Sequence, residues 1–445
     1  MSFKSGKHGA CLMPGVERMV AISALLLAAL LTPSAEAQTR LIVRDSLGLP
    51  GIDLTCSLLQ CSVVQGLGDP QGQLFLVIFP QTAVPATALA TINVQAGVLD
   101  VEIDQTATTQ DPNAGATPSY LTDETPTPYY GTSVWHGYLV QPGNQLVQTR
   151  SAQAAFGTAG AGVTVADIDT GVDLNHPVLK GVLVNGYDFT RNIPGGSEDT
   201  DVDASPDMSD AQTADVQQRT VAVLDQRTVA VLDGGNYQEF GHGTMTAGII
   251  HLVAPQAEIM PLKAFDASGA GYESNILRAI YYAVQNGAQV MNMSWDFDSY
   301  SGELATAVKY AQNQGAIVVA SAGNDGKDEY VYPGALPGVI NVASTSLEDT
   351  QSTFTNYGAP PVFMAAPGES IVTLYPWGTY AAGWGTSFST PFVAGTAALM
   401  LGRSGGCSSS RVAFGLARAD VIFNPALGWG RLDSYSALSA CRGLL

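Results

Sequence analysis

From about residue 150 onward, short apolar runs of strand length alternate with longer runs whose apolar residues recur at helical spacing. Val163–Ile168 is almost continuously apolar and predicts a buried strand, whereas Glu273–Asn286 predicts an amphipathic helix because its apolar residues fall on one face. Further predicted strands are Ile259–Ala264, Val290–Met293, Ile317–Ala320 and Val339–Ala343, and further predicted helices are Gly243–Leu252, Gly302–Gln314 and Pro391–Leu401. This alternation predicts an α/β domain of three layers, with helices on both faces of a central, mostly parallel sheet.

Residues 40–104 follow a different order of elements. The strand-like runs are Arg40–Asp45, Ser62–Leu67, Gln73–Pro80 and Val98–Asp104, and the helix-like runs are Pro50–Gln60 and Thr87–Gln95. The resulting order β-α-β-β-α-β predicts a small α+β unit of the ferredoxin-like kind. Residues 105–133 then turn polar and rich in Pro and Thr, which predicts an exposed linker.

The N-terminus has the layout of a secretory signal peptide. Basic residues precede an apolar run from Met19 to Leu31, and the small residues Ala35 and Ala37 follow it. The run is too short to cross a bilayer core of ~30 Å, and no later stretch reaches the ~18 apolar residues of a membrane helix. We therefore expect secretion, to the periplasm or the medium, with a buried N-terminal helix as the alternative.

Charge and cysteine content narrow the picture further. The formal net charge is −20, and the acidic residues are spread along the sequence. This argues against nucleic acid as a partner, because phosphate binding needs clustered Lys and Arg side chains. Four cysteines follow the signal peptide, and an even count in an exported protein favours disulfides. We predict that Cys407 pairs with Cys441. A Cys56–Cys61 bond is left open, and four free thiols are the alternative.

An excursion that begins near Gly186 combines a repeat with many acids. The octapeptide QRTVAVLD occupies residues 218–225 and is repeated without change at residues 226–233. The acids are Glu198, Asp199, Asp201, Asp203, Asp207, Asp210 and Asp215. We expect a solvated loop here, with a calcium-binding loop as the alternative because hard cations bind several carboxylates.

Three segments carry the parts of a nucleophilic serine site. A serine hydroxyl needs a base to take its proton and a third group to orient that base. Asp169 ends the apolar strand and precedes a Gly turn, and His242 lies between two glycines at the start of a predicted helix. Ser387 follows Gly-Thr, with Pro391 suited to the first turn of the next helix. Asp167 is unexpected in its apolar run, so we expect it to be paired or near a sheet edge.

These segments resemble the active-site motifs of the subtilisin-like serine proteases, a family in which the triad also follows the sequence order Asp, His, Ser. The matching motifs are Asp169-Thr170-Gly171, His242-Gly243-Thr244 and Gly385-Thr386-Ser387-Phe388-Ser389-Thr390-Pro391. Ser321-Ala322-Gly323-Asn324 resembles the segment that supplies the oxyanion hole, which implies that the Asn324 side chain and the Ser387 amide donate to the intermediate.

The resemblance also implies a substrate groove. Gly269-Ala270-Gly271 and the segment ending at Ser294 match the two stretches that pair with the substrate backbone as added strands. Trp295 and Asp296 depart from the family pattern beside this groove, and we expect them to narrow it or to favour a basic residue. Val331 is expected on the floor of the primary specificity pocket, where it would disfavour large aromatic side chains.

The domain organisation implied by the resemblance is a signal peptide at residues 1–37, an inhibitory propeptide at 38–104, a linker at 105–134 and a subtilisin-like catalytic domain at 135–445. We predict a self-processed, monomeric serine endopeptidase that acts on polypeptides, is inhibited by its own propeptide and requires no cofactor; calcium binding is left open. The alternative is a pseudoenzyme that binds peptides without cutting them.

Overall fold

The computed structural model describes residues 38–80, 84–109, 116–201, 221–223, 239–358, 361–419, 422 and 424–441. The predicted signal peptide and most of the repeat-bearing excursion lie outside these residues. No helix among the described residues is long and apolar enough to span a membrane.

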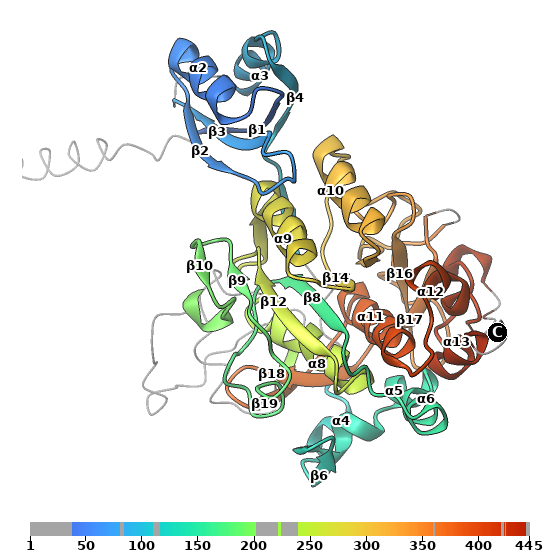
Figure 1. Ribbon diagram of the computed structural model, residues 1–445. Coiled ribbons are helices and arrows are strands. Elements are labelled where there is room, and N and C mark those ends of the chain that lie inside the picture. Colours follow the sequence, from blue (N-terminus) through green and yellow to red (C-terminus); the bar gives the residue numbers. More distant parts are fainter. Residues whose placement is uncertain are drawn as a thin grey trace, which may run out of the picture.

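The N-terminal unit is a four-stranded sheet with two helices on one face. Its elements are β1 (Thr39–Asp45), α2 (Leu49–Leu59), β2 (Ser62–Gly66), β3 (Leu74–Phe79), α3 (Pro85–Asn93) and β4 (Val98–Ile103), with strand order β2-β3-β1-β4. These match the element order expected from the sequence. The unit has its own apolar core, and a Cys56–Cys61 disulfide closes the end of α2. In Figure 1 the unit lies next to the ends of α9 and α10.

The part that the sequence predicts to be catalytic, called the catalytic part below, is built on an eight-stranded sheet of order β10-β9-β12-β8-β14-β15-β16-β17. All neighbouring pairs are parallel except β9 with β10. The strands are β8 (Thr164–Asp169), β9 (Tyr187–Asp188), β10 (Ile193–Pro194), β12 (Glu258–Lys263), β14 (Val290–Met293), β15 (Ile317–Ser321), β16 (Ile340–Thr345) and β17 (Met364–Pro367). The expected parallel sheet is confirmed.

Helices cover both faces of this sheet (Figure 1). Side chains of α8 (His242–Val253) and α11 (Thr386–Gly402) share one core with Val165, Val290 and Val319. Side chains of α9 (Glu273–Gln285) and α10 (Gly302–Asn313) share a second core with the alternate positions, such as Ala166 and Met291. Successive residues of a strand point to opposite faces, and both faces are buried, which explains why these strands are apolar throughout.

The remaining elements close the edges of the domain. They are β5 (Thr106–Thr108), η1 (Ser119–Thr122), β6 (Pro126–Tyr129), β7 (Thr132–Trp135), α4 (His136–Val140), α5 (Pro142–Leu146), α6 (Thr149–Phe156), η2 (Glu198–Asp201), β11 (Val221–Val223), β13 (Ala270–Tyr272), β18 (Ile371–Tyr375), β19 (Thr379–Gly383), α12 (Ser409–Leu416), η3 (Pro425–Leu427) and α13 (Ser434–Ala440). The predicted Cys407–Cys441 disulfide is present and ties α13 to the loop before α12.

The segment expected to be an exposed linker is partly packed. Leu121, Tyr129 and Val134 are buried in the same core as α8 and α11, and Thr106–Thr108 pairs as a strand with β13. The composition was misleading because Pro and Thr are compatible with edge strands, which require few backbone donors. The described parts of residues 105–134 are therefore attached to the catalytic part.

Candidate active site

Asp169 and His242 are joined by a short hydrogen bond. Asp169 is the last residue of β8 and is fully buried, and His242 is the first residue of α8. The imidazole Nδ1 lies 2.6 Å from Asp169 Oδ1, which also accepts from the backbone N–H of Thr170. An ionised carboxylate only accepts, so Nδ1 carries the proton and Nε2 is left with the basic lone pair.

The start of α8 is held close to the turn after β8. Gly241, the N-cap of α8, has φ of 95°, in the region that favours glycine. A Cβ on Gly243 would lie 2.0 Å from the carbonyl oxygen of Gly171, so only glycine allows this approach. The two glycines around His242 therefore let the helix begin against the Asp169 turn, and His242 lies at a helix start, as the sequence predicted.

Ser387 lies in the first turn of α11, near the positive end of that helix. The ring of the next residue, Phe388, has its centroid 5.8 Å from that of His242, which places this turn beside the imidazole. Ser387 is 3% exposed, and its Oγ donates to the carbonyl oxygen of Ser294 at 3.4 Å.

The helix that carries Ser387 begins earlier than expected. We placed Pro391 in the first turn, but α11 starts at Thr386 and Pro391 lies inside it. Proline has no N–H to donate to the carbonyl four residues before it, which is that of Ser387. This carbonyl oxygen instead accepts a hydrogen bond from the Ser294 hydroxyl at 3.0 Å. The helix therefore tolerates Pro391 through a contact with the segment after β14.

Asn324 is oriented by the residue before Ser387. The Asn324 side-chain oxygen accepts hydrogen bonds from the backbone N–H and the hydroxyl of Thr386, both at 2.9 Å. With Oδ1 engaged in this way, the Nδ2 group is the side-chain donor that Asn324 can offer to a ligand.

The protein's own backbone fills the slot predicted to bind substrate. β5 pairs antiparallel with β13, with Ala107 opposite Gly271. The Thr109 N–H donates to the carbonyl of Gly269 at 3.0 Å, and Thr108 bridges to Asp296 on the other side. An extended segment thus lies as an added strand between Gly269–Gly271, as expected, and Asp296, which follows the expected stretch that ends at Ser294.

Trp295 does not point into this slot. Its side chain is 1% exposed, and its indole N–H donates to the carbonyl of Ile168 at 2.9 Å. It packs with Phe265 and Phe297 in the core on the α9 side of the sheet. The expectation that Trp295 narrows the groove directly is therefore wrong. Val331 is 2% exposed and is likewise a buried side chain.

The N-terminal unit contacts the catalytic part through carboxylates at helix starts. Asp104 accepts from the backbone N–H of Ser274 in the first turn of α9. Glu102 accepts from the N–H groups of Gly302 and Glu303 at the start of α10. Anions are favourable at helix N-termini, where backbone donors lack partners. Burial raises the pKa of both carboxyls.

Two buried acids near Asp169 stand out. Glu198 belongs to the acidic excursion that we expected to be solvated, yet it is fully buried, and burial raises its pKa to about 7. Asp167, on the central strand β8, is paired, which was one of our two expectations. It accepts hydrogen bonds from the side chains of Asn292 and Thr246. Burial and the nearby Asp169 raise the pKa of Asp167 to about 8. Among the described residues, no three His, Cys, Asp or Glu side chains are grouped to hold a metal ion.

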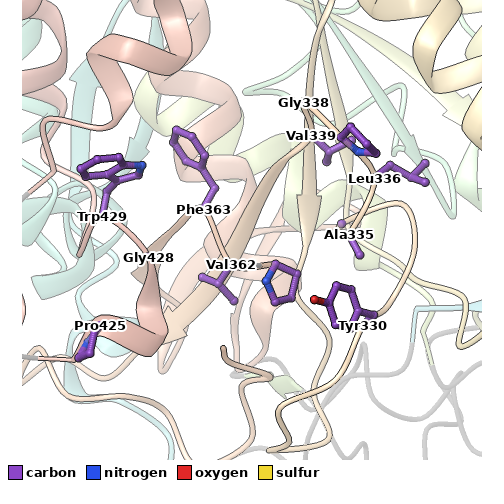
Figure 2. A pocket seen from close by; sticks show the side chains of 13 residues that line it. Tyr330, Ala335, Leu336, Gly338, Val339, Val362, Phe363, Pro425, Gly428 and Trp429 are labelled. Carbon is purple, nitrogen blue, oxygen red and sulfur yellow. The ribbon is translucent and has the colours of Figure 1, made fainter. Parts of the chain in front are cut away.

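A surface cavity of about 550 Å³ lies apart from these residues. Figure 2 shows it between Trp429 and Phe363 on one side and Tyr330 and Leu336 on the other. Its lining is mainly apolar and contains no carboxylate, histidine or thiol. Apart from the hydroxyl of Tyr330, it offers no side chain for acid–base or nucleophilic chemistry.

Comparison with known proteins places this site in a family. The profile described as "Subtilase family" matches residues 160–417. Thermitase from Thermoactinomyces vulgaris is 35% identical over 310 residues, which is 67% of this chain and 95% of thermitase. A thermophilic serine proteinase from Bacillus sp. (strain AK1) is 33% identical over 337 residues, or 73% of this chain and 72% of that protein.

A solved structure agrees in fold. Fervidolysin from Fervidobacterium pennivorans, described as a keratinolytic enzyme related to subtilisin, superposes with a TM-score of 0.68 at 22% identity. The match covers 92% of this chain and 62% of fervidolysin. The family match and the sequence relatives define the molecule as a serine-type endopeptidase that acts on polypeptides. The chain belongs to the subtilase family, and its fold is the subtilisin-like α/β fold.

Proposed function

We propose that Ser387, His242 and Asp169 form the catalytic triad. Ser387 Oγ attacks the scissile carbonyl carbon while His242 Nε2 takes its proton, and Asp169 stabilises the imidazolium through Nδ1. Collapse of the tetrahedral intermediate breaks the C–N bond, and the same proton passes to the leaving amine. Water, deprotonated by His242, then attacks the acyl carbon, and the ester bond to Ser387 breaks as His242 returns the proton to Oγ. The observation that carries this proposal is the 2.6 Å bond between His242 Nδ1 and Asp169.

Asn324 and the backbone N–H of Ser387 complete the site as donors to the developing oxyanion. The orientation of Asn324 supports this role, because Thr386 already occupies its side-chain oxygen. A donor fixed before the reaction stabilises the transition state without reorganisation.

Residues 38–104 act as an inhibitory propeptide, and residues 1–37 as a signal peptide that directs secretion. The support for inhibition is twofold: the N-terminal unit binds the starts of α9 and α10, and Thr106–Thr109 takes the place of substrate backbone beside Asp296.

We propose that the enzyme cleaves itself at a peptide bond after Thr109 and works as a monomer. The chemistry uses only side chains and water, so it needs no cofactor, and a role for calcium would concern stability.

Replacing Ser387 by Ala tests the triad and self-processing together. The variant should fold, release no peptides from a protein mixture and remain a full-length precursor. The parent should react with a fluorophosphonate probe at Ser387, and the variant should not. Maturation of the purified variant without added enzyme would refute self-processing. Mass spectrometry of peptides released by the parent would then define its cleavage preference.

A further inference from the structure

Glu198 joins the two segments that carry Asp169 and His242. Its Oε1 accepts from the Thr170 hydroxyl at 2.7 Å and from the Gly241 N–H at 2.5 Å. Its Oε2 accepts from the Thr244 hydroxyl at 2.6 Å. A single buried carboxylate therefore bonds the residue after Asp169 and residues on both sides of His242.

A second layer of hydrogen bonds extends this arrangement. The Thr170 hydroxyl oxygen accepts from the backbone N–H of Gly243 at 2.9 Å. The Thr244 hydroxyl oxygen accepts from the N–H of Asp173 at 2.8 Å. The backbone before and after His242 is thus tied to the turn that follows β8, either directly by Glu198 or through a threonine that Glu198 binds.

The first turn of α8 needs a hydrogen-bond acceptor from outside the helix. The first N–H groups of a helix lack intrahelical partners, and a side chain at the N-cap usually accepts from one of them. Here the N-cap is Gly241, which has no side chain and makes no cap hydrogen bond. Glu198 and Thr170 accept from this turn instead, from different segments of the sequence. Because glycines flank His242, its backbone has little intrinsic rigidity of its own.

We propose that Glu198 is a positioning residue: its carboxylate fixes the start of α8 against the Asp169 turn and so holds the His242 imidazole in its productive orientation. This inference rests on the proposed triad and concerns how the triad is held. Three donors point at the two oxygens of Glu198, so the ionised form satisfies all of them.

Several charged groups surround Glu198. Asp169 faces it from the turn after β8 and Lys263 from β12, where the ammonium donates to the carbonyls of Thr170 and Phe265 and pairs with Asp201. Asp173 lies on the other side of Thr244.

Two substitutions separate position from charge. Glu198→Gln keeps an acceptor oxygen for Gly241 and Thr170, and the Thr244 hydroxyl can turn to accept, so kcat should stay within about three-fold of the parent. Glu198→Ala removes the link, and displacement of the imidazole should lower kcat about 10- to 100-fold with little change in KM.

Asp188→Asn is the matched control, because Asp188 is a fully buried carboxylate of the same excursion that bonds Thr190, Arg191 and Thr200 rather than the segments around the triad. Each variant is matured by parent enzyme added in trans and quantified by fluorophosphonate titration, so that kcat refers to folded, reactive sites. The control should keep the kcat and the pH profile of the parent.

The outcomes are decisive. A Glu198→Ala kcat within two-fold of the parent, or an equal loss in Asp188→Asn, overturns the positioning role. A Glu198→Gln kcat as low as that of Glu198→Ala also overturns it. If the parent itself is not labelled at Ser387, the triad proposal fails instead, and this result cannot be confused with the others.

Discussion

Replacing Asp167 by Asn should change how the stability of the protein depends on pH. Asp167 is 1% exposed and two residues from Asp169 on the same strand, and burial together with Asp169 raises its pKa to about 8. The folded protein therefore holds this proton over a range in which the unfolded state, with a pKa of about 4, has lost it. The stabilising contribution is complete below about pH 4 and is lost as the pH rises through 8.

The size of the effect follows from one proton. Between about pH 5 and 7 the free energy of unfolding falls by about 1.4 kcal/mol for each pH unit, and from pH 6 to 8 the loss from this group is about 2 kcal/mol. Asn has the same shape and no proton to lose, and its amide can still meet Asn292 and Thr246. The variant should therefore gain about 2 kcal/mol relative to the parent between pH 6 and 8.

Urea unfolding at both pH values measures this difference. Both proteins should carry Ser387→Ala, so that self-digestion does not interfere, and Asp298→Asn provides a control at an exposed acid. A stability difference between variant and parent that is the same at pH 6 and pH 8 would refute the reasoning, because it would mean that Asp167 is already ionised in the folded protein.

Three further outcomes are expected. Asn324→Ala should lower kcat about 10²–10³-fold with KM nearly unchanged, the loss found on removing such a donor in another enzyme of this family, and a loss confined to KM would contradict the oxyanion role. Asp104→Ala leaves the Ser274 N–H without its carboxylate, which should weaken the contact between the N-terminal unit and α9 by about 1 kcal/mol. Limited trypsin digestion of the inactive precursor should therefore cleave the N-terminal unit faster, and an unchanged rate would argue against this contact. Replacing Cys407 and Cys441 by Ser opens a loop of 34 residues and should lower the free energy of unfolding by up to about 4 kcal/mol, measured by urea titration.

The sequence was sufficient to predict the sheet and the positions of Asp169, His242 and Ser387. Strands of a parallel sheet are buried on both faces, so their apolar runs are easily recognised, and the residues after them fall at one edge. Asp169 and Asn324 both follow such runs, at the ends of β8 and β15. The start of α11 was misplaced because Pro391 looks like a helix start, whereas its effect is compensated by Ser294 from another strand.

Features that depend on distant partners escaped prediction. Glu198 lies among acids that suggest a solvated loop, and its burial is favourable because Thr170, Gly241 and Thr244 donate to it. Trp295 is followed by Asp296, which bridges to Thr108, but its indole turns inward to reach the carbonyl of Ile168. One signal was available for Glu198: a helix with glycine at its N-cap requires an acceptor from elsewhere.

The segment in the slot between Gly269–Gly271 and Asp296 is bound through main-chain hydrogen bonds on both sides. Such binding discriminates weakly among side chains but strongly against any polypeptide whose amides are already hydrogen-bonded in a helix or sheet. Folded proteins, including other molecules of the enzyme, are thus cleaved only as often as their loops or termini unfold locally. If this slot binds substrate as proposed, the lifetime of the mature enzyme in concentrated solution depends on how often it unfolds locally.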